Sequence, residues 1–312
     1  MRIATTLIGL EKILAKECSG EVIIPGRVLF TKNKNLRSVL IVYDYITYFK
    51  FKDEDEIYRN VSKIKLKFKG SFRVDCSRIG EHMFNSQEIR QNIGEIIYNK
   101  GYKVNLNKPD NIFYVDIINE YCFFGKNPIN LGKRNYRVRA GKDSLNAVLA
   151  YSLLKIANFK KDEVLLDPFC GDGIILIEAG LIGGKKLYGL NQDIKNASIN
   201  SKVAKVKLNL YKNDLTWLST LFKQNSVDLI VTKPLFQSKT KSVNFVDKII
   251  KELFHQANYI LKKNARMILL TPKTELIEKY AKLYNFNIKE ELIVKCGNLN
   301  YKVLILNKKS FK

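Results

Sequence analysis

The chain of 312 residues is poor in the side chains on which most metal and redox sites depend. It has only two histidines, His82 and His255, which excludes most histidine-based metal centres and disfavours Ser-His-Asp or Cys-His catalysis. Its five cysteines are far apart and form no C-x-x-C pair, so we expect them to be small buried side chains. The sequence therefore predicts no metal site.

Long apolar runs and acidic residues are also scarce. The apolar stretch Ile3–Leu10 is far shorter than the roughly 18–20 residues that cross a membrane, and no basic-then-apolar leader opens the chain, so we expect a cytoplasmic protein without membrane contact. Lys and Arg number 54 against 30 Asp and Glu, a formal charge of +24. A protein this basic is expected to bind polyanions, and its length indicates two domains.

The first 50 residues alternate short strand-like and helix-like runs. Residues 2–6 are expected to be extended, 10–17 form an amphipathic helical pattern, and 35–44 carry apolar side chains at helical spacing. Residues 53–64 then predict a helix with four acidic residues at its start, where the helix dipole favours them. We expect a small α+β, ferredoxin-like unit at 1–50.

The segment from Lys63 to Lys69 alternates strictly between lysine and apolar side chains. The alternation predicts a strand with one cationic face. Such a strand is either an exposed edge guarded against aggregation or an RNA contact, and the sequence favours neither.

A strand, a turn containing glycine, a helix over 87–99 and further strands over 103–106 and 112–124 follow. This order resembles a THUMP domain, an RNA-binding module of tRNA-modifying enzymes, on the basis of Phe72-Arg-Val, Arg78-x-Gly80-x-His82 and Ser86. For His82 alone, a structural role in the turn is the favoured interpretation. The resemblance implies that RNA is bound by Lys65, Lys67, Arg73, Arg78, His82 and Ser86.

Residues 131–144 are interpreted as a basic linker. Lys133-Arg-Asn-Tyr-Arg-Val-Arg139 combines charge with an aromatic side chain, a pattern typical of phosphate neutralisation and base stacking. We expect Arg134 and Arg137 to contact RNA; a solvated charged linker is the competing account.

From residue 145 onward, helical and strand-like segments alternate strictly and end in two consecutive strands joined by a short turn over 296–300. Alternation predicts a doubly wound, mostly parallel α/β sheet, and the last two strands predict an antiparallel hairpin. This is the shape of the seven-stranded Rossmann-like methyltransferase fold.

The strongest motif is Val164-Leu-Leu-Asp-Pro-Phe-Cys-Gly-Asp-Gly-Ile174, a buried strand that turns through two glycines into a helix. The glycines allow close backbone approach to a ligand, and the helix start offers free N–H groups. The turn resembles the D-P-F-C-G-S-G-T loop of S-adenosyl-L-methionine-dependent RNA methyltransferases, with Asp172 in place of the usual Ser and Ile174 in place of Thr.

This resemblance implies S-adenosyl-L-methionine as cofactor. Asn191 stands where an acidic residue usually binds the cofactor ribose, and Asp214 stands where the adenine amino group is bound, although it is also placed to cap the helix that follows. The implied cofactor-binding residues are Asp167, Phe169, Gly171, Gly173, Asn191, Asp193 and Asp214.

After the fourth strand, the family places an Asp or Asn acceptor, a proline and an aromatic residue, which hold and stack an amino group for methylation. Pro234 and Phe236 fit, but Lys233 stands at the acceptor position. Three explanations are open: Lys233 is deprotonated by burial beside a cationic cofactor, Thr232 supplies the acceptor through its hydroxyl or its carbonyl, or the domain is a non-catalytic RNA-binding protein. The catalytic set is thus Thr232, Lys233, Pro234 and Phe236.

The whole chain resembles an archaeal-type tRNA guanine-N2 methyltransferase. The resemblance implies an α+β region at 1–50, a THUMP-like domain at 51–130, a linker at 131–144 and a methyltransferase domain at 145–312. It implies transfer of methyl to a guanosine N2 of tRNA, with position 10 favoured over position 6 by the register around Asp228. A catalytically degenerate tRNA-binding protein and a ribosomal RNA methyltransferase are the alternatives, and a monomer is expected.

Overall fold

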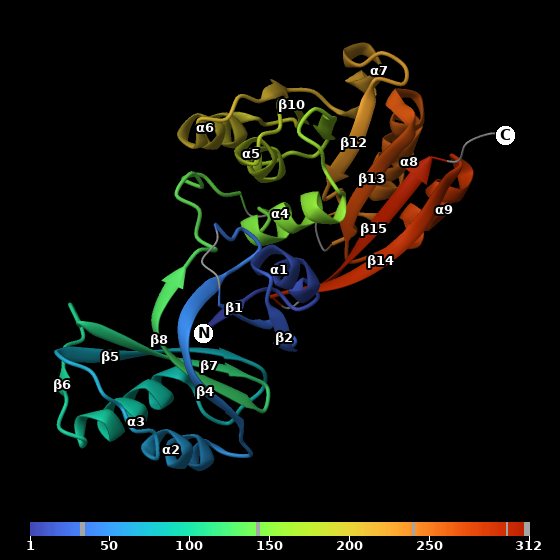
Figure 1. Ribbon diagram of the computed structural model, residues 1–312. Coiled ribbons are helices and arrows are strands. Elements are labelled where there is room, and N and C mark those ends of the chain that lie inside the picture. The colour runs from blue at the N-terminus through green and yellow to red at the C-terminus, as the bar shows by residue number, and fades with distance from the viewer. Residues whose placement is uncertain (32–34, 142–143, 239–240, 298, 309–312) are drawn as a thin grey trace.

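The computed structural model describes residues 1–31, 35–141, 144–238, 241–297 and 299–308. Figure 1 shows two halves along a diagonal, with the N-terminal half at the lower left and the C-terminal half at the upper right. The chain begins between the two halves, where β1 and α1 lie close to α4. Within the described residues, no helix combines the length and the hydropathy needed to cross a membrane.

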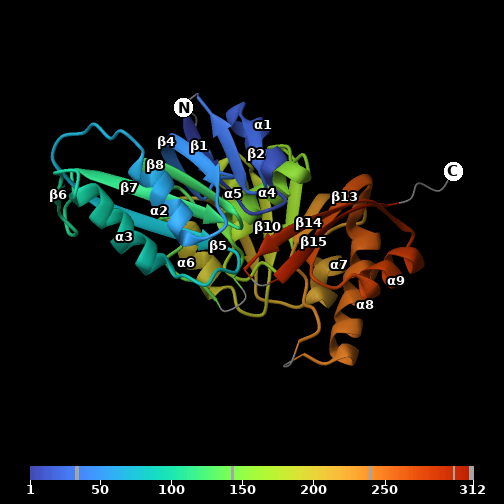
Figure 2. The same ribbon diagram turned by 90° about the horizontal axis from the view of Figure 1, so that it is seen from below.

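The N-terminal half is built on a sheet of eight strands in the order β2-β3-β1-β4-β8-β7-β5-β6, counted over the described residues. Its strands are β1 (Arg2–Thr5), β2 (Glu21–Ile24), β3 (Arg27–Phe30), β4 (Ile41–Lys50), β5 (Ser71–Ile79), β6 (Lys103–Val104), β7 (Asn111–Ile118) and β8 (Tyr121–Asn130). Its helices are α1 (Glu11–Cys18), α2 (Glu54–Ser62) and α3 (Ser86–Tyr98). Seen from below, α2 and α3 lie together against the part of the sheet formed by β5, β7 and β8 (Figure 2).

The sheet runs without a break from the first 50 residues into the THUMP-like segment. Strand β4 pairs with β1 on one side and with β8 on the other. A buried ion pair also joins the two parts: the Arg27 guanidinium of β3 donates to both carboxylate oxygens of Asp116 of β7 at 2.5 Å. Tyr43 and Ser77 donate to the same carboxylate, which satisfies this buried charge.

Three local predictions in this half are wrong. The strand predicted over 112–124 is divided by a turn at Asn119 and Glu120 into β7 and β8. Residues 35–44, predicted helical from their apolar spacing, contain the start of strand β4, because their β-branched and aromatic residues pair with β1. Residues 64–69 are not a strand: the lysines do face solvent and Ile64, Leu66 and Phe68 pack on the core. The backbone carbonyls of this segment bind side chains and not a neighbouring strand. Lys100 donates to the carbonyl of Ile64, and Tyr102 donates to the carbonyl of Leu66.

The C-terminal half has a seven-stranded sheet in the order β11-β10-β9-β12-β13-β15-β14 over the described residues, which confirms the predicted doubly wound fold with its antiparallel end. Its strands are β9 (Val164–Asp167), β10 (Lys186–Leu190), β11 (Asn209–Tyr211), β12 (Val227–Thr232), β13 (Leu261–Thr271), β14 (Phe286–Cys296) and β15 (Leu299–Lys308). Its helices are α4 (Ala147–Ile156), α5 (Ile174–Leu181), α6 (Lys195–Ala204), η1 (Leu215–Trp217), α7 (Leu218–Leu221), α8 (Val243–Ile260) and α9 (Glu275–Leu283).

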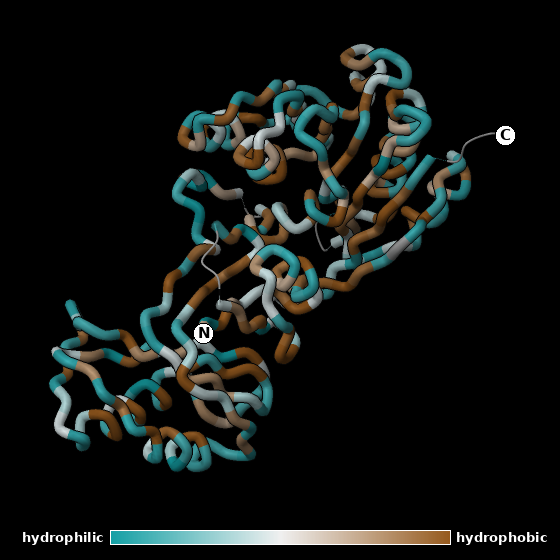
Figure 3. Tube along the Cα trace, viewed as in Figure 1, coloured by the Kyte–Doolittle hydropathy of each residue, from teal (hydrophilic) through white to brown (hydrophobic). Residues whose placement is uncertain are grey.

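Both faces of this sheet are covered. Successive residues of a strand point to opposite faces, so Leu165 packs with α4 and α5 whereas Leu166 packs with α8 and α9. Burial on both faces explains the apolar run 229–231 of β12, drawn in brown in Figure 3. The carboxyl ends of β9, β10 and β12 therefore meet at one edge of the sheet, which is where ligands bind in such folds.

The N-terminal half is packed directly against the C-terminal half. The Lys295 N–H of β14 donates to the Ile8 carbonyl at 3.0 Å, and the Tyr151 hydroxyl of α4 donates to Glu17 of α1 at 2.9 Å. Gly9, at φ +99°, is needed here, because a side chain would strike the Ile293 carbonyl oxygen at 2.0 Å. Leu10 also belongs to the core that covers α4 and α5.

Candidate active site

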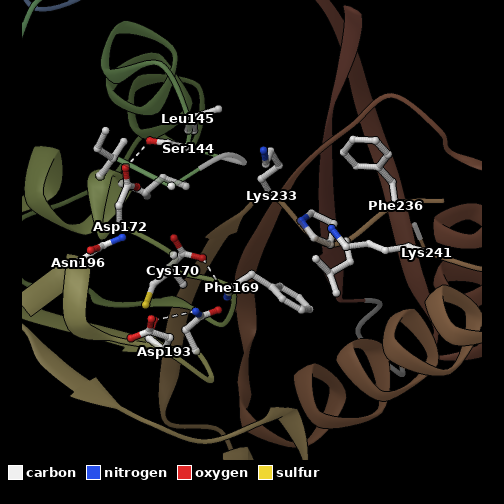
Figure 4. A pocket seen from close by; sticks show the side chains of 18 residues that line it. Ser144, Leu145, Phe169, Cys170, Asp172, Asp193, Asn196, Lys233, Phe236 and Lys241 are labelled. Carbon is white, nitrogen blue, oxygen red and sulfur yellow. Dashed lines mark hydrogen bonds between the residues drawn. The ribbon is translucent and has the colours of Figure 1, made fainter. Parts of the chain in front are cut away.

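A cavity of about 310 Å³ lies at the carboxyl edge of the C-terminal sheet. The loop between β9 and α5, the ends of β10 and β12, and the last part of the linker form its walls (Figure 4). Of the predicted site residues, it brings together Asp167, Phe169, Gly171, Asn191, Asp193, Lys233, Pro234 and Phe236. The glycine loop and the two strand ends, which are far apart in the sequence, therefore line one cavity.

The two glycines of the loop have different tasks. Gly171 has φ +51°, and a Cβ there would meet only the Phe169 carbonyl oxygen at 3.9 Å, so the space beside it is open on the cavity side. Gly173 has φ +79°, and its Cβ would lie 3.1 Å from the Cβ of Ala197 on α6. Gly171 thus leaves room for a ligand, and Gly173 allows α6 to pack on the loop.

Two buried carboxylates line the cavity. Burial raises the pKa of Asp167 to about 7, against the opposing effects of hydrogen bonds from the Thr232 hydroxyl and the Phe169 N–H. Burial also raises the pKa of Asp172, while Ser144 and Arg137 lower it. A cationic ligand would be favoured here, because it would stabilise the charged form of both groups.

Thr232 is placed differently from the expectation. Its side chain is fully buried, and its hydroxyl donates to Asp167 at 2.6 Å rather than lining the cavity. The hypothesis that this hydroxyl accepts from a substrate amine is therefore corrected: its role is to orient Asp167.

Lys233 lies in the cavity wall directly after β12. In Figure 4 its side chain lies between the Asp172 side and the Phe236 side of the site. Burial raises the pKa of the Cys296 thiol, and the charge of Lys233 opposes this rise, which places the lysine close to the β14–β15 turn. Phe236, two residues after Pro234, contacts the Tyr301 ring edge-on at a centroid distance of 6.5 Å.

At the end of β10, Asn191 and Asp193 line the cavity as predicted. The Asn191 amide nitrogen donates to the Asp193 carbonyl at 2.8 Å, which leaves its oxygen as an acceptor. Asp214 lies outside the cavity, because it caps the η1 turn by accepting from the Thr216 N–H at 3.0 Å. The capping role considered for Asp214 is therefore the one that is observed.

The predicted RNA-binding residues divide into three groups. Lys65 and Lys67 are exposed near the β6 end of β5, where Arg73 pairs with Asp75 at 2.9 Å. Arg78, His82 and Ser86 lie at the opposite end of β5. His82 has the structural role that the sequence favoured, because its Nδ1 contacts Arg78 at 3.0 Å and its Nε2 contacts the Asn119 carbonyl at 2.8 Å.

Arg134 and Arg137, which were expected to contact RNA, point instead towards carboxylates of the C-terminal half. The Arg134 side chain is 9% exposed and donates to Glu178 of α5 at 2.9 Å, so it does not present its charge to RNA. Arg137 turns towards Ser144 and Asp172. Figure 1 shows the linker rising from β8 beside α5 and α6 before it returns to α4.

Glu178 is the main residue that the sequence analysis missed. Its fully buried carboxylate accepts from Arg37, Arg134 and the Tyr136 hydroxyl, at 2.8, 2.9 and 2.6 Å. The available signal was a lone carboxylate inside the apolar helix Ile-Ile-Leu-Ile-Glu-Ala-Gly-Leu, which predicts a buried ion pair. Among the described side chains, no cluster of His, Cys, Asp and Glu suits a metal ion.

Comparison with known proteins is consistent with this site. Residues 134–302 match the RMKL-like methyltransferase domain, and residues 51–125 match the THUMP domain. The chain is 30% identical to a tRNA (guanine(6)-N2)-methyltransferase of Methanocaldococcus jannaschii, over 81% of each chain. It is 32% identical to the tRNA (guanine(10)-N2)-dimethyltransferase of the same organism, over 86% of this chain and 81% of that one.

A solved structure extends the similarity to the whole fold. The crystal structure of TrmN from Thermus thermophilus superposes with a TM-score of 0.79 at 26% identity, over 99% of each chain. The two matched domains and the superposition over nearly the whole chain thus agree with each other. The chain belongs to the family of RMKL-like methyltransferases that carry a THUMP domain.

Proposed function

We propose that the protein transfers a methyl group from S-adenosyl-L-methionine to the exocyclic N2 of a guanosine in tRNA. The proposal depends on one observation: the glycine loop and the residues Lys233, Pro234 and Phe236 line the same cavity, in a chain that also has a THUMP domain. The activities named for the relatives in M. jannaschii support this choice of substrate. In this proposal, residues 1–50 form an α+β region and residues 51–130 a THUMP-like RNA-binding domain. Residues 131–144 form a linker, and residues 145–312 form the methyltransferase domain.

The residues present fit the cofactor. Gly171 leaves open space, the carboxylates of Asp167 and Asp172 favour a cation, and Asn191 offers an acceptor for a ribose hydroxyl. When bound, the cofactor supplies an electrophilic methyl group on a sulfonium. Phe169 and Asp193 would hold its nucleoside from the β10 side of the cavity.

The chain's own residues would then act on the guanine. Phe236 would stack on the base, and Pro234 would fix the backbone beside it. The amine of Lys233 would accept the proton that N2 loses as the N2–methyl bond forms and the sulfur–methyl bond breaks, once it has given up its own proton beside the cationic cofactor. Lys233 thus takes the place of the Asp or Asn acceptor that the family uses.

The position of the modified guanosine is not assigned by the register around Asp228. Asp228 lies at the start of β12, away from the cavity, where it accepts from the Val164 N–H at 2.9 Å and from Lys262 at 2.6 Å. Its role is structural, and it does not bear on the sequence register, which still favours position 10 over position 6. The two relatives name positions 6 and 10, and both are candidates.

Unmodified tRNA transcript incubated with labelled S-adenosyl-L-methionine tests the proposal directly. Nucleoside mass spectrometry is expected to find N2-methylguanosine, and transcripts with adenosine at position 6 or at position 10 identify the site. A transcript that binds together with the cofactor and gains no methyl group would contradict the enzyme and support the RNA-binding alternative.

Cofactor affinity is expected to depend on pH through Asp167. Because its folded-state pKa of about 7 is above the unfolded value of 3.8, the free protein loses stability as pH rises between these values. A bound cation reverses the preference and favours the ionised carboxylate. The Kd of S-adenosyl-L-methionine should therefore be about tenfold higher at pH 6 than at pH 8. Calorimetry on the parent chain and on Asp167→Asn checks this, since the variant should bind with a nearly flat pH profile.

A further inference from the structure

The end of the linker is tied to the loop between β9 and α5 by three polar side chains. Arg137 donates to the Ser144 hydroxyl at 2.5 Å, and Ser144 in turn donates to the Asp172 carboxylate. The Arg137 Nε lies 3.9 Å from the same carboxylate oxygen. This Nε is buried and has no hydrogen-bond partner among the described atoms. Its charge is therefore compensated by the ion pair with Asp172.

Asn200 holds the backbone behind these side chains. It is fully buried on α6, and its amide nitrogen donates to the carbonyls of Arg139 and Asp172, at 2.7 and 3.0 Å. Its amide oxygen accepts from the Arg139 N–H at 3.0 Å. A single side chain thus fixes the linker and the cofactor loop to one helix.

The linked residues form one wall of the cavity. Gly141 and Ser144 on the linker side and Asp172 on the loop side all line it, as the left part of Figure 4 shows for Ser144 and Asp172. Asp172 is only 6% exposed, and a buried carboxylate is costly unless donors and a cation accompany it. Arg137 and Ser144 supply both, and they do so from a segment that follows the THUMP-like domain in the chain.

We propose that Arg137, Ser144 and Asp172 form a linker latch that closes this wall, so that tight cofactor binding requires the linker to be in place. The three are positioning residues, and the inference deepens the proposed function because it rests on the cofactor assigned there. Where the family loop has Ser, the Asp172 carboxylate adds the charge that attracts Arg137. The wall therefore depends on linker and loop together.

Isothermal calorimetry with S-adenosyl-L-methionine and with S-adenosylhomocysteine on the full chain tests the latch without measuring activity. Ser144→Ala breaks the connection and is expected to raise the Kd of both about tenfold, because a buried charged acceptor loses its donor. Arg137→Met should have a similar effect, and Arg137→Lys should restore part of the affinity. The double variant Ser144→Ala/Arg137→Met should bind no more weakly than the weaker single variant, since both act through one connection.

Glu163→Gln is the matched control. It removes a partly buried ion pair with Arg266, at 2.6 Å, at the opposite end of β9, and should leave both Kd values unchanged. Hydrogen exchange adds a second readout: cofactor should slow amide exchange over 131–141 in the parent chain but not in Ser144→Ala.

Kd values within twofold of the parent for both Ser144→Ala and Arg137→Met, in folded protein, would overturn the latch. If Ser144→Ala does not fold, Arg137→Met decides, because its side chain is partly exposed and nearly the same size. A parent chain that binds neither compound would overturn the cofactor assignment instead, which separates the failure of the two proposals.

Discussion

Replacing Lys233 with methionine is expected to lower kcat for guanine N2 methylation by about 10²–10⁴-fold, with a change in cofactor Kd of less than about threefold. The reason is that methionine keeps the length and the apolar stem of lysine but cannot accept the proton that leaves N2. With the Thr232 hydroxyl bound to Asp167, no other side chain of the predicted catalytic set can accept it. Single-turnover kinetics on a tRNA transcript measures the effect.

Lys233→Asp provides the sharper comparison, because it returns the acceptor that the family uses at this position. It should keep more activity than Lys233→Met. Lys273→Met is the control: Lys273 lies on the loop after β13, donates to Gln237 at 2.8 Å and has no part in the proposed chemistry. Full activity in Lys233→Met would remove the lysine from the mechanism.

Glu178→Gln is expected to give the largest loss of stability. The variant keeps the shape of the side chain but leaves Arg37 and Arg134 without their carboxylate, and breaking a buried pair costs about 3–5 kcal/mol. Because Arg37 is 26% exposed and partly solvated, we expect a loss of about 3 kcal/mol. For a domain of this size, that corresponds to a fall in the Tm of the methyltransferase transition by about 6–12 °C, measured by differential scanning calorimetry.

Tyr136→Phe is the milder companion of this variant. It removes one hydrogen bond to Glu178 and no charge, so it should cost about 1–2 kcal/mol. Equal Tm values for Glu178→Gln and the parent would contradict the structural importance of this carboxylate.

How much the sequence predicted depends on how local each interaction is. The alternation of helices and strands from residue 145 onward was predicted correctly, because burial periodicity and the turn residues act within a few positions. The loop between β9 and α5 was expected for the same reason, since glycine adopts its positive φ values most readily. The segment over 35–44 was predicted wrongly because its strand depends on pairing with β1 and β8.

The ion pairs of Arg37 and of the linker residue Arg134 with Glu178 could not be predicted. Arg37 and Glu178 are 141 positions apart, and Arg134 and Glu178 are 44 apart, so no spacing rule relates them. A basic run beside an aromatic residue has the same appearance whether its charges face RNA or a buried carboxylate. Only the position of α5 beside the linker decides between the two.

The unbroken sheet around β4 restricts movement between residues 1–50 and the THUMP-like domain. A hinge between residues 1–50 and the THUMP-like domain would have to break the ladder between β4 and β8 and separate Arg27 from Asp116. The first 50 residues in turn pack on α4 and on the β14–β15 hairpin. The first 50 residues therefore connect the THUMP-like domain to the C-terminal sheet through backbone pairing on one side and side-chain packing on the other.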